Sequence, residues 1–167
     1  MATPPFVALA FGLAALPICL WVTYADLSRM KIPNRAVLAL AGVFAVGGLL
    51  LLPLEGWTLA DWSWRWVNLA VVLVVGMLLN AVWLIGAGDA KFAAAAAPFI
   101  AASDWRALAG IYFACLVVTW ILHRIAKYSF GRRLAPGWAS WDSGKRFPMG
   151  IAMVATLLAY LAVAAFA

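Results

Sequence analysis

The sequence predicts an all-α, polytopic membrane protein: a bundle of six transmembrane helices with both termini outside. Its composition is the first observation. Of 167 residues, 68% are hydrophobic and only 11% are charged, whereas soluble domains carry about 25% charged residues. The second observation is a series of apolar runs long enough to cross about 30 Å of hydrocarbon, which takes roughly 20 helical residues. No linker or sequence repeat divides the chain, so we expect one domain.

The predicted spans follow these apolar runs in chain order. The first run has no Lys or Arg before it and is about 20 residues long, which argues against a secretory signal. The fourth is apolar but short. Measured from Asp89 to Ala102 it would be about 21 Å long, less than the thickness it must cross. The six predicted spans are residues 6–25, 36–54, 66–85, 92–102, 106–123 and 148–166.

Basic residues assign the connections to the two sides of the membrane. Connections 26–35 and 123–147 carry three and six Lys or Arg residues, whereas connections 55–65 and 103–106 carry one each. By the positive-inside rule the first two face the cytoplasm. Both reach the same side only if the short fourth span is counted, and six spans then place both termini outside. The net charge of +6 follows from this topology and favours anionic lipid, so it requires no nucleic-acid partner.

Two aspartates do not belong to solvated loops. Asp26 closes the first span and Asp89 begins the short fourth one, so both lie at cytoplasmic helix ends. The shortness of the fourth span draws Asp89 below the membrane surface. An ionised carboxylate costs about 2.5 to 3.5 kcal/mol at the bilayer centre and less near the edge, so Asp89 must face water, face a partner or be protonated. Gly86 and Gly88 supply irregular backbone, which is tolerated at depth only where it is buried in protein or lines water.

Each aspartate alone has a simpler interpretation. Asp89 could be the N-cap of an alanine-rich helix, and Asp26 could form an interfacial ion pair with Arg29 or Lys31. Together they indicate a pair that shares a proton, with one carboxylate as base toward water and the other as acid toward a carbonyl. This aspartic protease chemistry needs no metal or other cofactor. The alternative is a small proton- or cation-coupled transporter, but that predicts polar residues along several spans, and these spans carry few.

Three motifs resemble those of one family. The sequence GAGDAK at 86–91 matches the GxGDxK pattern of the type IV prepilin peptidases, membrane aspartyl proteases of the GxGD group. The sequence DLSRMKIPN at 26–34 resembles that family's first motif, an aspartate followed at fixed distance by Ile-Pro-Asn. The sequence FPMGIAM at 147–153 resembles the Pro-x-Gly opening of its last helix. The resemblance covers essentially the whole chain and is greatest to small single-domain members that process Flp-type pilins of tight-adherence systems.

The resemblance implies a single transmembrane peptidase domain over residues 1–167, located in the bacterial inner membrane. It implies removal of the short basic leader of a prepilin or pseudopilin at the cytoplasmic face, with Asp26 and Asp89 as the catalytic pair. Larger members carry an extra cytoplasmic region with zinc-binding cysteines and N-methyltransferase activity. No counterpart lies between Phe6 and Ala36, so we expect no metal site and no N-methylation. The residues expected to shape the site are Gly86, Gly88, Lys91, Pro33, Asn34, Pro148 and Gly150.

The shaping residues have distinct expected roles. Pro33 disfavours helix at the residue before it and turns the chain between the first two spans. Lys91 either lowers the average charge of the aspartate pair or extends to the membrane surface. Pro148 and Gly150 start the last helix and let it pack closely near the site. The basic and aromatic segment 124–147 is expected to lie on the anionic inner leaflet or to cover the site.

Overall fold

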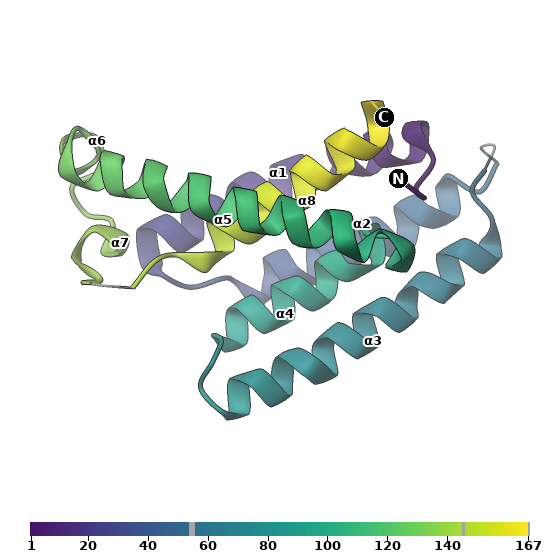
Figure 1. The fold of residues 1–167 in the computed structure, drawn as a ribbon, viewed down its shortest axis with the longest axis horizontal. Coiled ribbons are helices and arrows are strands. Elements are labelled where there is room, and N and C mark those ends of the chain that lie inside the picture. The colour runs from purple at the N-terminus through teal and green to yellow at the C-terminus, as the bar shows by residue number, and fades with distance from the viewer. Residues whose placement is uncertain (54–55, 145, 167) are drawn as a thin grey trace.

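The computed structural model describes residues 1–53, 56–144 and 146–166, and this part of the chain is helical without strands. Lys145, which is counted in the charge argument, lies outside the described residues. The long helices form one elongated bundle (Figure 1). Both termini lie at one end of it, and the short helices α6 and α7 lie at the other.

Within the described part of the chain, four helices are long and apolar enough to cross a membrane: α1, α3, α8 and α5 together with η2. Helix α2 is apolar but has 17 residues, and α4 has 10. The all-helical membrane class is therefore confirmed, while the six-span arrangement stays a prediction. The elements are α1 (Pro5–Arg29), α2 (Asn34–Leu50), α3 (Leu59–Ala81), α4 (Ala87–Ala96), η1 (Ala97–Phe99), η2 (Ala102–Asp104), α5 (Trp105–Tyr128), α6 (Gly131–Leu134), α7 (Ala139–Asp142) and α8 (Met149–Phe166).

The connection between α1 and α2 is a tight turn. Helix α1 ends at Arg29, and its C-cap Met30 has a left-handed φ of 53° and donates its N–H to the carbonyl of Asp26 at 2.9 Å. This is the common way for a helix to end, although glycine usually occupies the position. Pro33 is extended and is the N-cap of α2, which begins at Asn34, two residues before the predicted span. Its carbonyl accepts a hydrogen bond from Ala36 N at 3.0 Å.

Helix α4 begins earlier than the sequence predicts. Gly86 is its N-cap, and Asp89 lies inside the first turn instead of in front of it. The interpretation of Asp89 as an N-cap is therefore wrong, because the glycine before the helix occupies that position. After Ala96 the chain tightens into η1, where Pro98 follows the first residue. At 1.5 Å per α-helical and about 2.0 Å per 3₁₀ residue, α4 and η1 together are about 21 Å long.

Helix α3 also begins earlier than predicted, which moves Arg65 from a loop into the protein. A capping box starts the helix, in which Thr58 Oγ1 accepts from Asp61 N and the Asp61 side chain accepts from Thr58 N, both at 3.1 Å. Arg65 lies beyond this turn and is 7% exposed. The expectation of a loop residue is wrong here, since the guanidinium donates to the carbonyl of Phe99 at 3.1 Å.

The core lies toward the end of the bundle that holds the termini. The rings of Phe11, Phe44 and Phe99 contact one another with centroids 5.1 to 5.4 Å apart, and Trp57 meets two of them edge-on. Elsewhere α1 packs chiefly on α8, α3 on α4, and α5 on α8. This packing fixes the opposite end of the bundle, where α1 ends and where α4 and α8 begin.

Candidate active site

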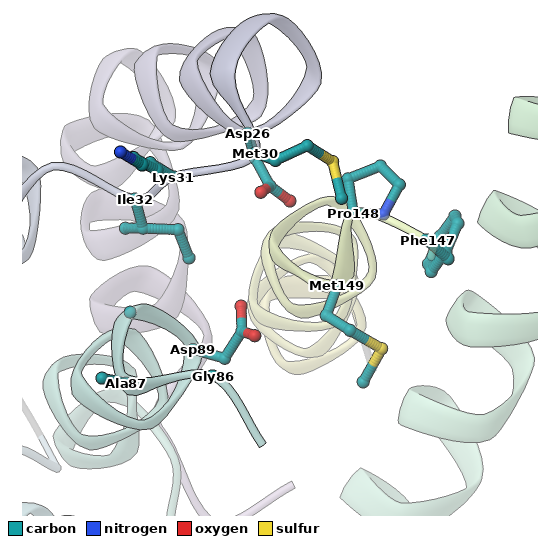
Figure 2. A pocket seen from close by; sticks show the side chains of 11 residues that line it. Asp26, Met30, Lys31, Ile32, Gly86, Ala87, Asp89, Phe147, Pro148 and Met149 are labelled. Carbon is teal, nitrogen blue, oxygen red and sulfur yellow. The ribbon is translucent and has the colours of Figure 1, made fainter. Parts of the chain in front are cut away.

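A cavity of about 350 Å³ lies where the three sequence motifs meet. It is formed by the end of α1 with the turn that follows it, by the start of α4, and by the chain that leads into α8. Figure 2 shows the carboxylates of Asp26 and Asp89 pointing toward one another across this cavity, beside the start of α8. The lining residues are Asp26, Met30, Lys31, Ile32, Gly86, Ala87, Gly88, Asp89, Phe147, Pro148 and Met149.

Asp26 projects from the last turn of α1 and is 5% exposed. Its Oδ2 atom accepts a hydrogen bond of 2.8 Å from the backbone N–H of Gly150, in the first turn of α8. A Cβ atom on Gly150 would lie 2.7 Å from Oδ2 and 3.1 Å from Cγ of Asp26. Only glycine therefore lets the backbone of α8 approach this carboxylate closely enough to donate the bond.

Asp89 projects from the first turn of α4 and is partly buried. A Cβ atom on Gly86 would lie 2.8 Å from its Oδ2 atom, so this carboxylate also packs directly against a glycine. A Cβ atom on Gly88 would lie 3.4 Å from Cβ of Ile32. The start of α4 thus packs closely on the turn that follows α1, and this contact brings the two aspartates to one cavity.

The other expected shaping residues divide between the cavity and the surface. Pro148 lines the cavity and immediately precedes α8. Lys91 and Asn34 are exposed and do not line it, but Nζ of Lys91 donates to Oδ1 of Asn34 at 3.2 Å. This bond joins the start of α4 to the start of α2. Pro33 ends the turn between α1 and α2 and also lies outside the lining.

Six lining residues were not among the site residues expected from the sequence. Lys31 brings a positive charge to the cavity, and the others bring apolar surface. Only their position could have indicated them, because each lies inside one of the three motifs. The six residues are Met30, Lys31, Ile32, Ala87, Phe147 and Met149.

The chemistry available to this cavity comes from its carboxylates. Among the described residues, no group of three or more His, Cys, Asp or Glu side chains is arranged to hold a metal ion. The volume exceeds that of several water molecules, each of which occupies about 30 Å³. Two carboxylates that face shared water can exchange a proton with it and with each other.

The fold and this cavity define a helical membrane protein whose candidate reaction centre is a pair of facing carboxylates. The family model of the type IV leader peptidases matches residues 13–167, and the chain belongs to this family. The match includes both aspartates and all three motifs. Among curated proteins no match is found, and none is found among solved structures. Membership supports a protease of the type that removes the leaders of type IV prepilins.

Proposed function

We propose that this chain is an aspartic endopeptidase that removes the short basic leader of prepilins or pseudopilins at the cytoplasmic face of the bacterial inner membrane. One observation carries the proposal. Asp26 and Asp89 come from helices far apart in the sequence, face one cavity, and each packs against a glycine. The family match supports peptidase activity, and the prepilin substrate follows from that family.

The proposed reaction uses one proton shared by the aspartate pair, because two close carboxylates do not readily ionise together. The ionised carboxylate removes a proton from water, and the water oxygen attacks the carbonyl carbon of the scissile peptide. The protonated carboxylate gives its proton to the carbonyl oxygen, which yields a diol. The diol collapses as the C–N bond breaks. The leaving nitrogen takes the proton that came from water, and a diol hydroxyl returns a proton to the other carboxylate.

The hydrogen bond from Gly150 gives the two oxygens of Asp26 different roles in this proposal. Oδ2 accepts the backbone N–H at 2.8 Å, so it is engaged as an acceptor. The exchangeable proton of Asp26 is then carried on Oδ1. The bond also fixes the plane of the carboxylate, and such fixed orientation contributes strongly to proton-transfer catalysis.

We also propose six spans, with α2 and the α4–η1 pair completing the four long helices. Arg29, Lys31 and Arg35 lie in or beside the turn between α1 and α2, and Lys31 lines the cavity. Arg132 and Arg133 lie in α6, at the same end of the bundle (Figure 1). A basic end of this kind supports a cytoplasmic location and contact with anionic lipid.

The test is leader removal in cells that express the chain together with candidate prepilins. Asp26→Asn and Asp89→Asn keep the side-chain volume but remove proton exchange, so each should lower cleavage by about 10² to 10⁴-fold. Asp142→Asn is the matched control, because Asp142 forms an exposed ion pair with Arg132 at 2.8 Å, away from the cavity lining. A gel shift of the prepilin at equal membrane abundance measures the effect.

Near-normal cleavage by either variant of the pair would contradict the aspartic mechanism. The same samples also test the nature of the product. Mass spectrometry of the processed pilin should find a free amino terminus when this chain is the only added enzyme. A methylated terminus would contradict cleavage without N-methylation.

A further inference from the structure

A second hollow, which we call the apolar groove, runs along the bundle from Asp89. Helix α3 packs chiefly on α4 and η1, and α5 packs chiefly on α8, so α3 and α5 do not close over α4. Figure 1 shows α3 and α5 on opposite sides of α4. The space between them is about 810 Å³ and includes Val71 of α3, Ala93 of α4, Ala109 of α5 and Met153 of α8 in its lining.

The lining of the apolar groove suits an apolar occupant. Of the described residues that line it, Asp89 alone is charged. The polar side chains Asn68 and Thr156 are already engaged, since Asn68 donates to the carbonyl of Ile100 at 2.9 Å and Thr156 donates to that of Ala152 at 2.7 Å. The small side chains of Ala93 and Ala96 in α4 leave space for this occupant. An apolar helix can therefore lie against most of this lining, and Trp105 and Tyr112, which also line the groove, carry further polar groups that an amphipathic helix can meet.

The apolar groove is continuous with the aspartate cavity. Gly86, Asp89 and Met149 line both. A chain that occupied the groove as a helix and continued past its end would therefore bring the residues before the helix directly to Asp89. This is the arrangement that a cut immediately before an apolar helix requires.

We propose that the apolar groove binds the apolar helix that follows the scissile bond of the substrate, and that it thereby sets which bond reaches the aspartates. This inference rests on the proposed function, which supplies a substrate cut just before such a helix. The groove acts as the binding site and the aspartate cavity as the reaction site. When the groove holds the helix, the scissile bond is already positioned beside the aspartates within the enzyme–substrate complex.

Disulfide crosslinking tests occupancy separately from cleavage. Ala109→Cys places a thiol in the groove, and Ala107→Cys places one on the same exposed stretch of α5 outside the groove. Both are made in a chain with Asp89→Asn and Cys115→Ala, so that the substrate stays intact and the partly buried Cys115 does not compete. Prepilins with single cysteines through the apolar helix are the probes. Crosslinks should form from position 109 with helical spacing, and should be at least about tenfold weaker from position 107.

A second measurement uses cleavage by an otherwise unchanged chain. Ala109→Phe should fill the groove and lower prepilin cleavage by about tenfold or more, whereas Ala107→Phe should retain it. If the unsubstituted chain cleaves the prepilin, but position 109 forms no crosslinks and Ala109→Phe cleaves normally, lipid fills the groove and this inference is overturned while the proposed function stands. Crosslinks between two copies of the chain through position 109 would overturn it in favour of self-association. No cleavage of any prepilin by the unsubstituted chain would overturn the proposed function, and this inference with it.

Discussion

Each candidate catalytic carboxylate lies against a glycine, and this contact defines the site at the scale of single residues. Gly150 packs against the carboxylate of Asp26 and donates its N–H to it, and Gly86 packs against the carboxylate of Asp89. Neither contact requires an unusual backbone angle at the glycine. The need for glycine comes from space, because a methyl group at either position would displace the carboxylate it touches.

Gly150→Ala should therefore lower leader cleavage by about 10²-fold, the loss expected when a catalytic group moves by about 1 Å. Gly110→Ala is the matched control, since Gly110 also lies inside a helix but an added Cβ there would meet nothing within 4 Å. Leader removal is measured at equal membrane abundance. Cleavage by Gly150→Ala equal to that of Gly110→Ala would show that the Asp26–Gly150 contact does not orient the reaction.

At the scale of elements, the short helix α4 is held at both of its ends. Asp89 lies in the first turn, where a negative charge is favoured by the helix dipole. Beyond the other end, Arg65 donates to the carbonyl of Phe99 in η1 and, at 2.9 Å, to Oγ1 of Thr3. Its guanidinium also lies 5.0 Å above the ring of Trp57. A buried guanidinium thus binds the carbonyl end of the α4–η1 unit.

Arg65→Ala should destabilise the protein, because it leaves buried acceptors without donors at a cost of about 1 to 3 kcal/mol each. A loss of about 2 kcal/mol corresponds to a fall in Tm of roughly 4 to 8 °C for a chain of this size. Thermal unfolding in detergent measures it. Arg106→Ala is the control, since Arg106 is exposed and stacks on Trp105. An equal Tm for the two variants would mean that Arg65 does not hold η1 in place.

These two elements also show what the sequence could and could not predict. The lengths of the apolar runs and the distribution of charge predicted a short helix after Gly86 and Gly88. They also predicted that Asp26 and Asp89 lie at the same end of the bundle. They did not predict that Gly86 would be the N-cap, because the start of the helix depends on tertiary packing, in which Gly88 lies close to Ile32. Arg65 looked like a loop residue because its partners are carbonyls more than 30 residues away.

At the scale of the whole molecule, the termini and the candidate site occupy opposite ends. At the end that holds the termini, Asp104 connects the N-terminal segment to α8. Its carboxylate accepts hydrogen bonds from Ala2 N at 2.9 Å and from the hydroxyl of Tyr160 at 2.7 Å. The cavity and the basic helix α6 lie at the other end (Figure 1). The charge pattern predicts six spans with both termini on the side opposite the aspartates, and this topology stays a prediction. The sequence could not predict the apolar groove, which depends on how far apart α3 and α5 pack.

A topology reporter fused to the carboxyl end should report the periplasm, and one inserted near Pro136 should report the cytoplasm. The reason is that ten of the twelve Lys and Arg residues fall on one predicted side. Paired alkaline phosphatase and fluorescent protein fusions measure the two positions. A cytoplasmic carboxyl end would contradict the six-span topology, and it would remove the argument for a cytoplasmic active site.

The glycine contacts have a genetic consequence. A single base change converts any glycine codon to an alanine codon, so the smallest missense change at Gly86 or Gly150 already inserts a methyl group into the space of a carboxylate. At Gly110 and Gly137 the same base change adds a methyl group to open space. Under selection for leader processing, the first two codons should accept only synonymous changes, although neither encodes a side chain that takes part in the chemistry.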